Sequence, residues 1–297
     1  MTEAAAHANG RPTFDLQSHS RHSDGALAPS EVVAAAAADG VELLALSDHD
    51  SVDGVPAARE AAQHAGIRLV SAVEISAIDR GQSDLHILGY VIDDRDPVLL
   101  GRLEQYRAQR EGRAHAMAQA LRELGFELDQ DALDARAAQG KSIGRPHLAQ
   151  AVVSHPANAE RLAAEHHEEA SAFLVAYLID GRPAFREREG PSVPDSIEAI
   201  HDAGGVAVWA HPFWDIPDAD AVLETVDRFR SFGIDGVECF YPTHEQEQAA
   251  LLADRCAELG LLTTGSSDYH GPAHRQFRAF RAFSTYGREP QLGPIAG

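Results

Sequence analysis

Short apolar runs alternate with helical apolar spacings along most of the chain. A run of roughly four to eight apolar residues between turn residues predicts a buried strand, and apolar residues at i, i+3 and i+4 predict a helix. A glycine closely follows each predicted helix, as is common where a helix ends. Repeated strand–helix alternation is typical of an α/β fold with a mainly parallel sheet, open or closed into a barrel. The strands are predicted at residues 14–17, 43–47, 68–75, 85–92, 206–210, 236–240 and 261–264, and the helices at residues 30–38, 55–65, 196–203, 219–232 and 245–259.

The alternation fails in the middle of the chain, where helical spacings continue without a strand pattern. We therefore predict an inserted all-helical cap domain at residues 97–191, within a discontinuous barrel domain at residues 13–96 and 192–288. The alternative is a spacer that only supports the barrel. Residues 1–12 are predicted as a flexible tail and residues 289–297 as a C-terminal tail. Helices of the insert are predicted at residues 99–124, 131–139, 146–153, 158–166 and 168–178.

Polar residues accompany nearly every predicted strand. In parallel α/β folds, functional sites form at the edge of the sheet where the carboxyl ends of the strands meet. One candidate, His86, differs from the others because it lies near the start of its predicted strand rather than at the end. Because so many imidazoles and carboxylates fall at one edge, we expect them to lie together. The others are Gln17, His19, His22 and Asp24 after the first strand, Asp48, His49 and Asp50 after the second, Glu74 in the third, His211 after the fifth, His244 after the sixth, and Asp268 and His270 after the seventh.

These residue types suit divalent metal ions. Neutral imidazole binds Zn, Fe and Mn, whereas carboxylates bind Mn and Mg and can bridge two ions. Five histidines with three carboxylates exceed the ligands of one four-coordinate ion, so we predict two or three divalent ions. Glu74 follows an apolar strand segment, and a buried carboxylate needs a compensating partner such as a metal.

Each of these residues also has a structural alternative. A single histidine at a strand end is often a hydrogen-bonded core or surface residue. Asp24 lies in a Ser-Asp-Gly sequence that is also an ordinary turn. Asp48 and Asp50 either orient His49 or serve as polar loop groups. The joint pattern favours metal binding for His19, His49, His86, His211, Asp268 and His270.

The charge balance argues against some partners. The chain of 297 residues has 46 Asp and Glu against 25 Lys and Arg, which gives a formal net charge of −21. Binding to duplex nucleic acid or to an anionic membrane surface relies on basic residues, so neither partner is expected. Two cysteines are too few for a disulfide framework, and the N-terminal residues lack a basic and apolar leader pattern. We therefore expect a cytoplasmic protein.

At these strand ends the sequence resembles the PHP (polymerase and histidinol phosphatase) family of metal-dependent phosphoesterases. The resemblance implies a distorted (β/α)7 barrel with two or three Mn, Fe, Zn or Mg ions at its mouth. The Gly-Arg-Pro-His segment at residues 144–147 is similar to the branch that hydrolyses nucleoside 3′,5′-bisphosphates or removes nucleotides from the 5′ end of short RNA. The other matching segments are residues 14–25, 45–54, 73–75, 85–90, 204–212 and 264–271.

The resemblance implies a set of metal ligands and two departures from the family pattern. The first-strand His-x-His of the family reads Gln17-Ser18-His19 here, so an amide replaces one imidazole. A Gln oxygen is a weaker and harder ligand, so one metal position is expected to be weak, altered in identity or empty. The glycine usual before the last Ser-Asp is Ser266, a smaller departure. The implied ligands are Gln17, His19, Asp24, His49, Glu74 as the bridging carboxylate, His86, His211, Asp268 and His270.

A basic pair in the insert supplies the predicted phosphate contacts. Arg145 and His147 match residues that hold the substrate phosphate in relatives, and a guanidinium grips phosphate with two hydrogen bonds. The alternative for this pair is a plain helix start. His244 resembles a further pocket residue, with a surface position as its alternative. We predict a metal-dependent phosphatase that cleaves a small nucleotide, or short single-stranded RNA, with a hydroxide bridging two ions.

Catalysis is assigned to Glu74, His211, Asp268 and His270, and the two histidines are candidate general acids if not both are ligands. Two rival functions remain. One is another phosphatase of this family, for a cyclic phosphate or histidinol phosphate, although the Gly-Arg-Pro-His insert disfavours histidinol phosphate. The other is a catalytically impaired protein that binds a nucleotide or metal, because Gln17 replaces a ligand histidine.

Overall fold

The computed structural model describes residues 12–80, 82–138, 143–187 and 189–297. The predicted flexible tail lies outside this description except for Pro12. The chain divides into two compact units. The barrel unit comprises Met1–Glu104 with Pro191–Gly297, and the helical unit comprises Gln105–Gly190. Among the described residues, no helix is long and apolar enough to cross a membrane.

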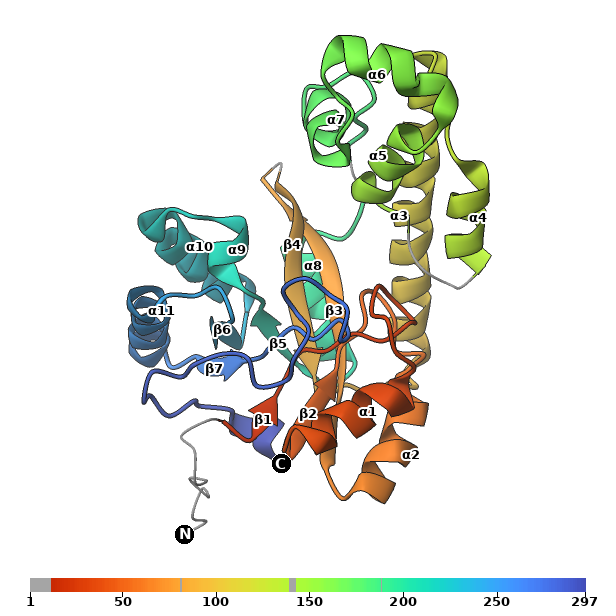
Figure 1. Ribbon diagram of the computed structural model, residues 1–297. Helices are drawn as coiled ribbons and strands as arrows, with labels where there is room; N and C mark the ends of the chain where they lie inside the picture. Colours follow the sequence, from red (N-terminus) through yellow and green to blue (C-terminus); the bar gives the residue numbers. More distant parts are fainter. Residues whose placement is uncertain (1–11, 81, 139–142, 188) are drawn as a thin grey trace. The chain divides into compact units, whose positions relative to one another are not determined.

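One seven-stranded sheet forms the centre of the barrel unit, and its strands follow one another in chain order (Figure 1). The seven predicted strands are confirmed. The sheet is mainly parallel, as expected, but β4 runs antiparallel to both β3 and β5. The strands are β1 (Phe14–Asp15), β2 (Leu43–Leu46), β3 (Arg68–Asp79), β4 (Gln82–Tyr90), β5 (Val206–Trp209), β6 (Gly236–Phe240) and β7 (Leu262–Gly265).

The first and last strands meet, so the sheet closes almost completely into a barrel. The backbone N–H of Leu16 donates to the carbonyl of Gly265 at 3.3 Å, and Ser18 forms a parallel bridge with Tyr269. The regular pairing of β1 ends at Asp15, earlier than predicted. Beyond Asp15, a side chain connects the segment after β1 to β2, since the Ser18 hydroxyl donates to the carbonyl of Ala45 at 2.7 Å. The predicted barrel of the α/β class is confirmed.

Strands β3 and β4 extend further than their apolar patterns predicted. They form a long antiparallel hairpin in which Ser76 pairs with His86 and Asp79 pairs with Gln82. The predicted strand at 68–75 stops four residues before the end of β3, and the predicted strand at 85–92 begins three residues late and runs two residues past the end of β4. The hairpin continues because backbone pairing, unlike burial, does not require apolar side chains.

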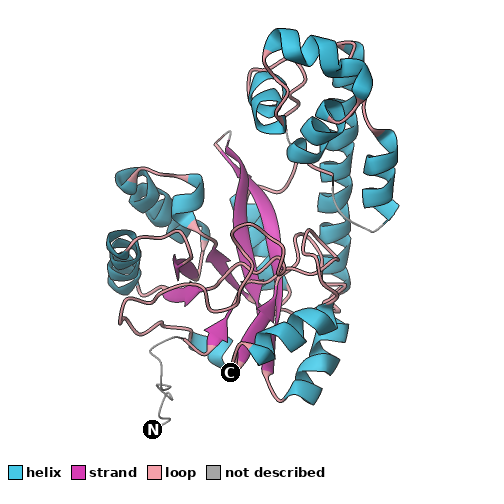
Figure 2. Cartoon of the chain, in the orientation of Figure 1, coloured by secondary structure: helices cyan, strands magenta, loops and turns pink. Residues whose placement is uncertain are grey.

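Helices cover the outside of the sheet, as Figure 2 shows. The five predicted helices are confirmed at nearly the same bounds, and the glycines after them have positive φ, from 67° to 98°. One short helix, α9 (Pro212–Asp215), was not predicted because a single turn leaves no periodic pattern. The five are α1 (Pro29–Ala38), α2 (Val55–Ala65), α8 (Val193–Asp202), α10 (Ala219–Phe232) and α11 (Gln246–Leu259).

The C-terminal residues belong to the barrel rather than to a free tail. A 3-10 helix, η2 (Gly293–Ala296), buries Ile295 to 2% exposure. Ile295 joins the apolar cluster around Leu16 and Tyr90, whose hydroxyl donates to the carbonyl of Leu16 at 2.9 Å. The predicted C-terminal tail at 289–297 is therefore wrong, since apolar burial there adds to the core.

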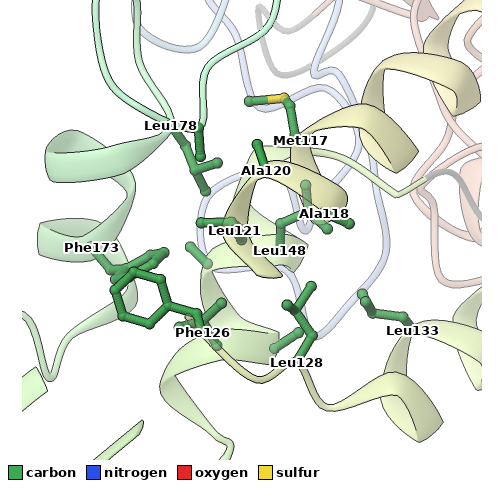
Figure 3. Close-up of a cluster of buried hydrophobic side chains, with 14 of the residues drawn as sticks. Met117, Ala118, Ala120, Leu121, Phe126, Leu128, Leu133, Leu148, Phe173 and Leu178 are labelled. Atoms are coloured by element: carbon green, nitrogen blue, oxygen red, sulfur yellow. The ribbon is translucent and has the colours of Figure 1, made fainter. Parts of the chain in front are cut away.

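Helices account for the regular secondary structure among the described residues of the helical unit. They surround a core that includes Leu121, Phe126, Leu148 and Phe173 (Figure 3). The unit begins within α3, whereas the predicted insert at 97–191 includes the first residues of that helix. The role of a cap stays a prediction. The helices are α3 (Pro97–Glu123), α4 (Gln130–Ala138), α5 (Arg145–Val153), η1 (Pro156–Asn158), α6 (Ala159–Glu165) and α7 (Ala170–Tyr177), and position 139 of the predicted fourth helix lies outside the described residues.

Phe126 tests the core of the helical unit. It is 1% exposed, and its ring meets that of Phe173 edge to face with centroids 5.0 Å apart. We expect Phe126→Ala to lower the free energy of unfolding of this unit by about 3–5 kcal/mol, because it leaves a cavity. Urea unfolding followed by circular dichroism measures the change. Val175→Ala on α7 is the control, since Val175 is 52% exposed and should change stability by less than about 0.5 kcal/mol.

Candidate metal centre

The barrel brings most of the predicted ligands to one place. They come from the segments that follow β1, β2, β5 and β7, and from within β3 and β4 (Figure 1). His86 joins them from the middle of β4, which runs antiparallel to its neighbours and places this residue beside Ser76 in β3 and beside the segment that follows β5. The side chains brought together are His19, Asp24, His49, Glu74, His86, His211, Asp268 and His270.

Glu74 lies at the centre of this group and has no solvent exposure. Its Oε1 is 2.7 Å from Nδ1 of His86 and 3.4 Å from Nε2 of His211. Its Oε2 is 3.0 Å from Nε2 of His19 and 3.7 Å from Nδ1 of His49. Each carboxylate oxygen thus faces two imidazoles, which is the arrangement expected of a carboxylate that bridges metal ions.

Three overlapping groups of side chains have the geometry of metal ligands. In each group, the ligand atoms all lie within 4.8 Å of one another. Glu74 belongs to two of the groups, so ions held in them would be neighbours. The groups are His19, Glu74 and Asp268; His49, Glu74 and His86; and His19, Asp24, His49 and His270.

Unpaired buried atoms show that this donor set fits metal ions. Nε2 of His19, Nδ1 of His49 and Oδ1 of Asp268 are buried and make no hydrogen bond with the described residues. Leaving such atoms without partners is costly, and cations satisfy nitrogen and oxygen lone pairs that point at one another. Imidazole with carboxylate is a donor set typical of Zn, Mn and Fe.

The electrostatics keep the carboxylates in their ligand form. Burial alone would raise the pKa of Asp268, but the charge of His270 lowers it to about 2. Burial lowers the pKa of His49 to about 4, so its ring is neutral near pH 7. Burial also favours neutral His19, yet the neighbouring carboxylates of Asp268 and Glu74 raise its pKa well above the usual value. A metal at His19 therefore replaces a proton, and metal affinity should fall at acid pH.

Two of the predicted ligands sit on left-handed backbone. The φ angle is 30° at His211 and 53° at Asp268, and such angles cost about 1–3 kcal/mol in non-glycine residues. The backbone N–H of His211 donates to Oε2 of Glu238 at 2.9 Å, and the Tyr241 hydroxyl donates to Oδ2 of Asp268 at 2.7 Å. Glu238 and Tyr241 therefore hold the strained ligands in place.

Sequence analysis missed Glu238, although the signal was present. Like Glu74, it is an acidic residue inside an apolar strand, and it has no solvent exposure. Burial raises its pKa to about 8, so this carboxyl group is mostly protonated near neutral pH. Tyr241 had no such signal, because its bond to Asp268 joins segments far apart in the chain.

Asp48 holds the loop after β1, whereas Asp50 bonds the backbone of strand β3. Asp48 accepts hydrogen bonds from the backbone N–H and the hydroxyl of Ser20 and from the hydroxyl of Ser23, at 2.6–2.7 Å. Asp50 accepts from the backbone N–H of Ser76 at 3.0 Å. Of the two alternatives considered, these contacts support the role of a polar loop group for Asp48.

The remaining predicted residues are placed as follows. Gln17 is buried, and its side chain contacts Glu74 and Ser266. His244 is 2% exposed, so the surface alternative is wrong; its Nδ1 lies 3.0 Å from the carbonyl of Cys239. His22 is exposed.

Arg145 and His147 begin helix α5 in the helical unit. The backbone N–H of Gly144 donates to Nδ1 of His147 at 3.1 Å, so this imidazole caps the first turn. Their predicted contact with the substrate phosphate stays a prediction.

The chain matches the model of the PHP domain over residues 15–171. This span is more than half of the 297 residues. The chain belongs to the PHP family. The predicted family, its barrel fold and its class, metal-dependent phosphoesterases, are confirmed.

Relatives within the PHP family resemble the chain over most of its length. A 5′-3′ exoribonuclease of Haemophilus influenzae is 34% identical over 87% of this chain and 90% of its own. A 3′,5′-nucleoside bisphosphate phosphatase of Chromobacterium violaceum is 33% identical over 87% of each chain. A phosphoribosyl 1,2-cyclic phosphate 1,2-diphosphodiesterase of Eggerthella lenta is 30% identical over 94% of this chain and 97% of its own.

Solved structures agree with the PHP assignment. An amidohydrolase of Chromobacterium violaceum, solved with bound sulfate, has a TM-score of 0.73 at 30% identity and covers 88% of this chain and 89% of its own. A structure described as a metal-dependent phosphoesterase of Bifidobacterium adolescentis has a TM-score of 0.72 at 29% identity, with coverage of 90% and 91%.

Removing the charge of Glu74 tests the metal centre. Gln keeps the size of Glu but brings an N–H₂ group toward the imidazoles in place of a negative oxygen. We expect Glu74→Gln to lose at least one bound metal equivalent, with affinity falling by at least roughly 10–100-fold. Metal analysis after dialysis against Mn measures this. Glu60→Gln on the exposed face of α2 is the matched control, and full metal retention in Glu74→Gln would contradict the assignment.

Proposed function

We propose that the chain hydrolyses phosphate esters of small nucleotides, releasing inorganic phosphate from a nucleoside 3′,5′-bisphosphate. The observation that carries the proposal is the buried Glu74 carboxylate shared by four imidazoles, with Asp24 and Asp268 beside it. Such a donor set serves phosphoester hydrolysis. The proposal extends to the 5′ ends of short single-stranded RNA, because relatives with either activity are similarly close to this chain.

Divalent ions bound here would polarise a phosphoryl oxygen, lower the pKa of a coordinated water and stabilise the leaving oxygen. The protein residues hold those ions and set their positions. Glu74 has both oxygens engaged inside the site, whereas the side chain of Asp24 is 34% exposed. Oδ1 of Asp24 lies 3.3 Å from Nε2 of His270. The side of the centre with Asp24 is therefore open to an entering phosphate.

His211 and His270 act as ligands rather than as the general acid in this proposal. Nδ1 of His211 lies 3.6 Å from Oδ2 of Asp215, and Nδ1 of His270 lies 2.7 Å from the carbonyl of Asp268. At His270 this acceptor keeps the proton on Nδ1 and leaves the Nε2 lone pair for a metal, and at His211 the negative charge of Asp215 favours the same tautomer. Both Nε2 atoms face carboxylates of the centre, Glu74 and Asp24 respectively.

An exposed aromatic ring beside the centre, that of Trp214, supports a nucleotide substrate. Trp214 is 51% exposed and lies one helical turn from the ligand His211, since its backbone N–H donates to the carbonyl of His211 at 2.9 Å. Its ring centroid is 5.7 Å from that of Phe277, which is 5.7 Å from the ring of His270. Aromatic rings stack on nucleic-acid bases, and a base attached to a bound phosphate needs such a surface nearby.

Predicted roles outside the centre are part of this proposal. Arg145 and His147 would hold a phosphate of the substrate, and His244 would line its pocket. Nε2 of His244 is buried without a hydrogen-bond partner among the described residues, which leaves it available to a ligand. Cyclic phosphates are the second candidate substrate class, favoured by the similarity to the Eggerthella lenta enzyme.

A phosphate-release assay tests the reaction. Purified protein with Mn, Zn, Fe or Mg is given adenosine 3′,5′-bisphosphate, a 5′-phosphorylated RNA trinucleotide, or a ribose cyclic phosphate. Released phosphate is measured for the first substrate, and chromatography measures the released mononucleotide or the ring-opened monoester for the other two. We expect phosphate release from the bisphosphate with at least one metal, and a loss of rate of at least about 100-fold in Asp268→Ala, because a metal ligand is removed. Equal activity in Asp268→Ala or after chelation would rule out the reaction. Asp220→Ala on exposed α10 is the control for lost charge.

Trp214→Ala tests the stacking surface. We expect KM for adenosine 3′,5′-bisphosphate to rise roughly 5- to 100-fold, since stacking contributes about 1–3 kcal/mol per base, while kcat changes little. Trp214→Phe should keep most of the affinity because a ring remains. Hydrolysis of a phosphate ester without a ring, such as glycerol phosphate, should be unaffected by either change. An unchanged KM in Trp214→Ala would exclude base stacking at this position.

A further inference from the structure

The two departures from the family pattern, Gln17 and Ser266, touch each other. Oε1 of Gln17 lies 3.2 Å from the hydroxyl of Ser266, although 249 positions separate them in the chain. Both side chains are buried. Ser266 Oγ is also 2.6 Å from Oε1 of Glu238, so the amide, the hydroxyl and the carboxyl form one chain of contacts beside the metal centre.

The orientation of the Gln17 amide follows from the chemistry of its neighbours. Nε2 of Gln17 donates to Oε2 of Glu74 at 2.9 Å. An ionised carboxylate only accepts hydrogen bonds, so the N–H₂ group must face Glu74 and the amide oxygen must face away. Ser266 can meet that oxygen because a hydroxyl is a donor. An amide nitrogen has no free lone pair, so Gln17 offers Glu74 a hydrogen bond but offers a metal no ligand.

Among the described residues, three ligands then remain in the group next to Gln17. These are Nε2 of His19, Oε2 of Glu74 and Oδ1 of Asp268. Oε2 is also the oxygen that accepts the bond from Gln17, so part of its electron density is already engaged. Of the other two groups, the one with His49, Glu74 and His86 includes the carboxylate that Gln17 contacts, and the one with His19, Asp24, His49 and His270 does not.

We propose that Gln17 and Ser266 act together as positioning residues, which fix Glu74 by a neutral hydrogen bond where relatives use a metal ligand. The position formed by His19, Glu74 and Asp268 consequently binds its ion more weakly than the positions around His49. The inference rests on the proposed hydrolytic function, with the centre working chiefly through its remaining ions. The hydroxyl of Ser266 donates to the amide oxygen of Gln17 and so keeps the N–H₂ group of Gln17 toward Glu74. The two departures from the family pattern therefore act together.

A cycle of four proteins tests the proposal by metal binding instead of activity. They are the wild type, Gln17→His, Ser266→Gly and the double variant, each stripped of metal and titrated with Mn by calorimetry. We expect the wild type to bind one equivalent at least roughly 10-fold more weakly than the rest. Ser266→Gly alone should not tighten it, because no ligand is added. The double variant should tighten it by at least about 10-fold, and more than Gln17→His alone.

Gln17→Glu gives a second measurement that does not depend on packing a new ring. It keeps the shape of Gln17, but it places two carboxylates together and so needs a cation between them. We expect its Tm to depend more steeply on Mn concentration than that of the wild type. Ser267→Ala, beside Ser266 in the chain, is the matched control.

Two results would overturn the proposal. One is a wild type in which all Mn equivalents bind with the same affinity, and the other is a double variant that binds Mn no more tightly than the wild type. Phosphate release by the wild type is measured separately. Its absence would refute the hydrolytic function while leaving the metal-binding result to decide the roles of Gln17 and Ser266.

Discussion

The site depends on one buried charge. Glu74 has no exposed surface, and transferring an ionised carboxylate from water into a protein interior costs several kcal/mol unless partners compensate. Its partners are four imidazoles and one amide, contributed by segments after β1, β2 and β5 and by β4. The ionised carboxylate of Glu74 is stabilised only when the barrel brings these segments together. The order of the strands and the set of ligands therefore depend on each other.

Closure of the barrel meets this constraint. The pairing of Leu16 with Gly265 places the segment after β1 beside the segment after β7, and so His19 lies 3.1 Å from Asp268. The antiparallel course of β4 brings His86 to the same edge. Backbone strain at His211 and Asp268 then aims two ligands inward, and hydrogen bonds from the surrounding fold offset its cost.

Periodicity predicted the strands and helices because burial imposes it on every residue of an element. The ligands were predictable for a related reason, since a strand that ends in an imidazole or a carboxylate departs from the apolar pattern. Contacts distant in sequence left no such pattern. The hydrogen bond of Tyr241 and the antiparallel direction of β4 depend on how neighbouring strands pair, and the contact between Gln17 and Ser266 depends on closure of the barrel. Asp48 shows a further limit of sequence analysis. An aspartate at this position suits both a residue that orients His49 and a polar loop group, and its three hydrogen bonds decide for the loop group.

The geometry of the metal centre bears on how a chain with a net charge of −21 can attract a phosphate group. The low pKa of Asp24, Glu74 and Asp268, held down by the neighbouring histidines, keeps all three carboxylates ionised within a few ångströms of one another. A phosphate group that approached this cluster alone would meet repulsion from the cluster and from the whole protein. Under the proposed function, bound divalent ions would reverse this sign locally, so they would assist the binding of the phosphate as well as the cleavage of its ester bond. The attraction for phosphate would then be strongest at the site of the reaction.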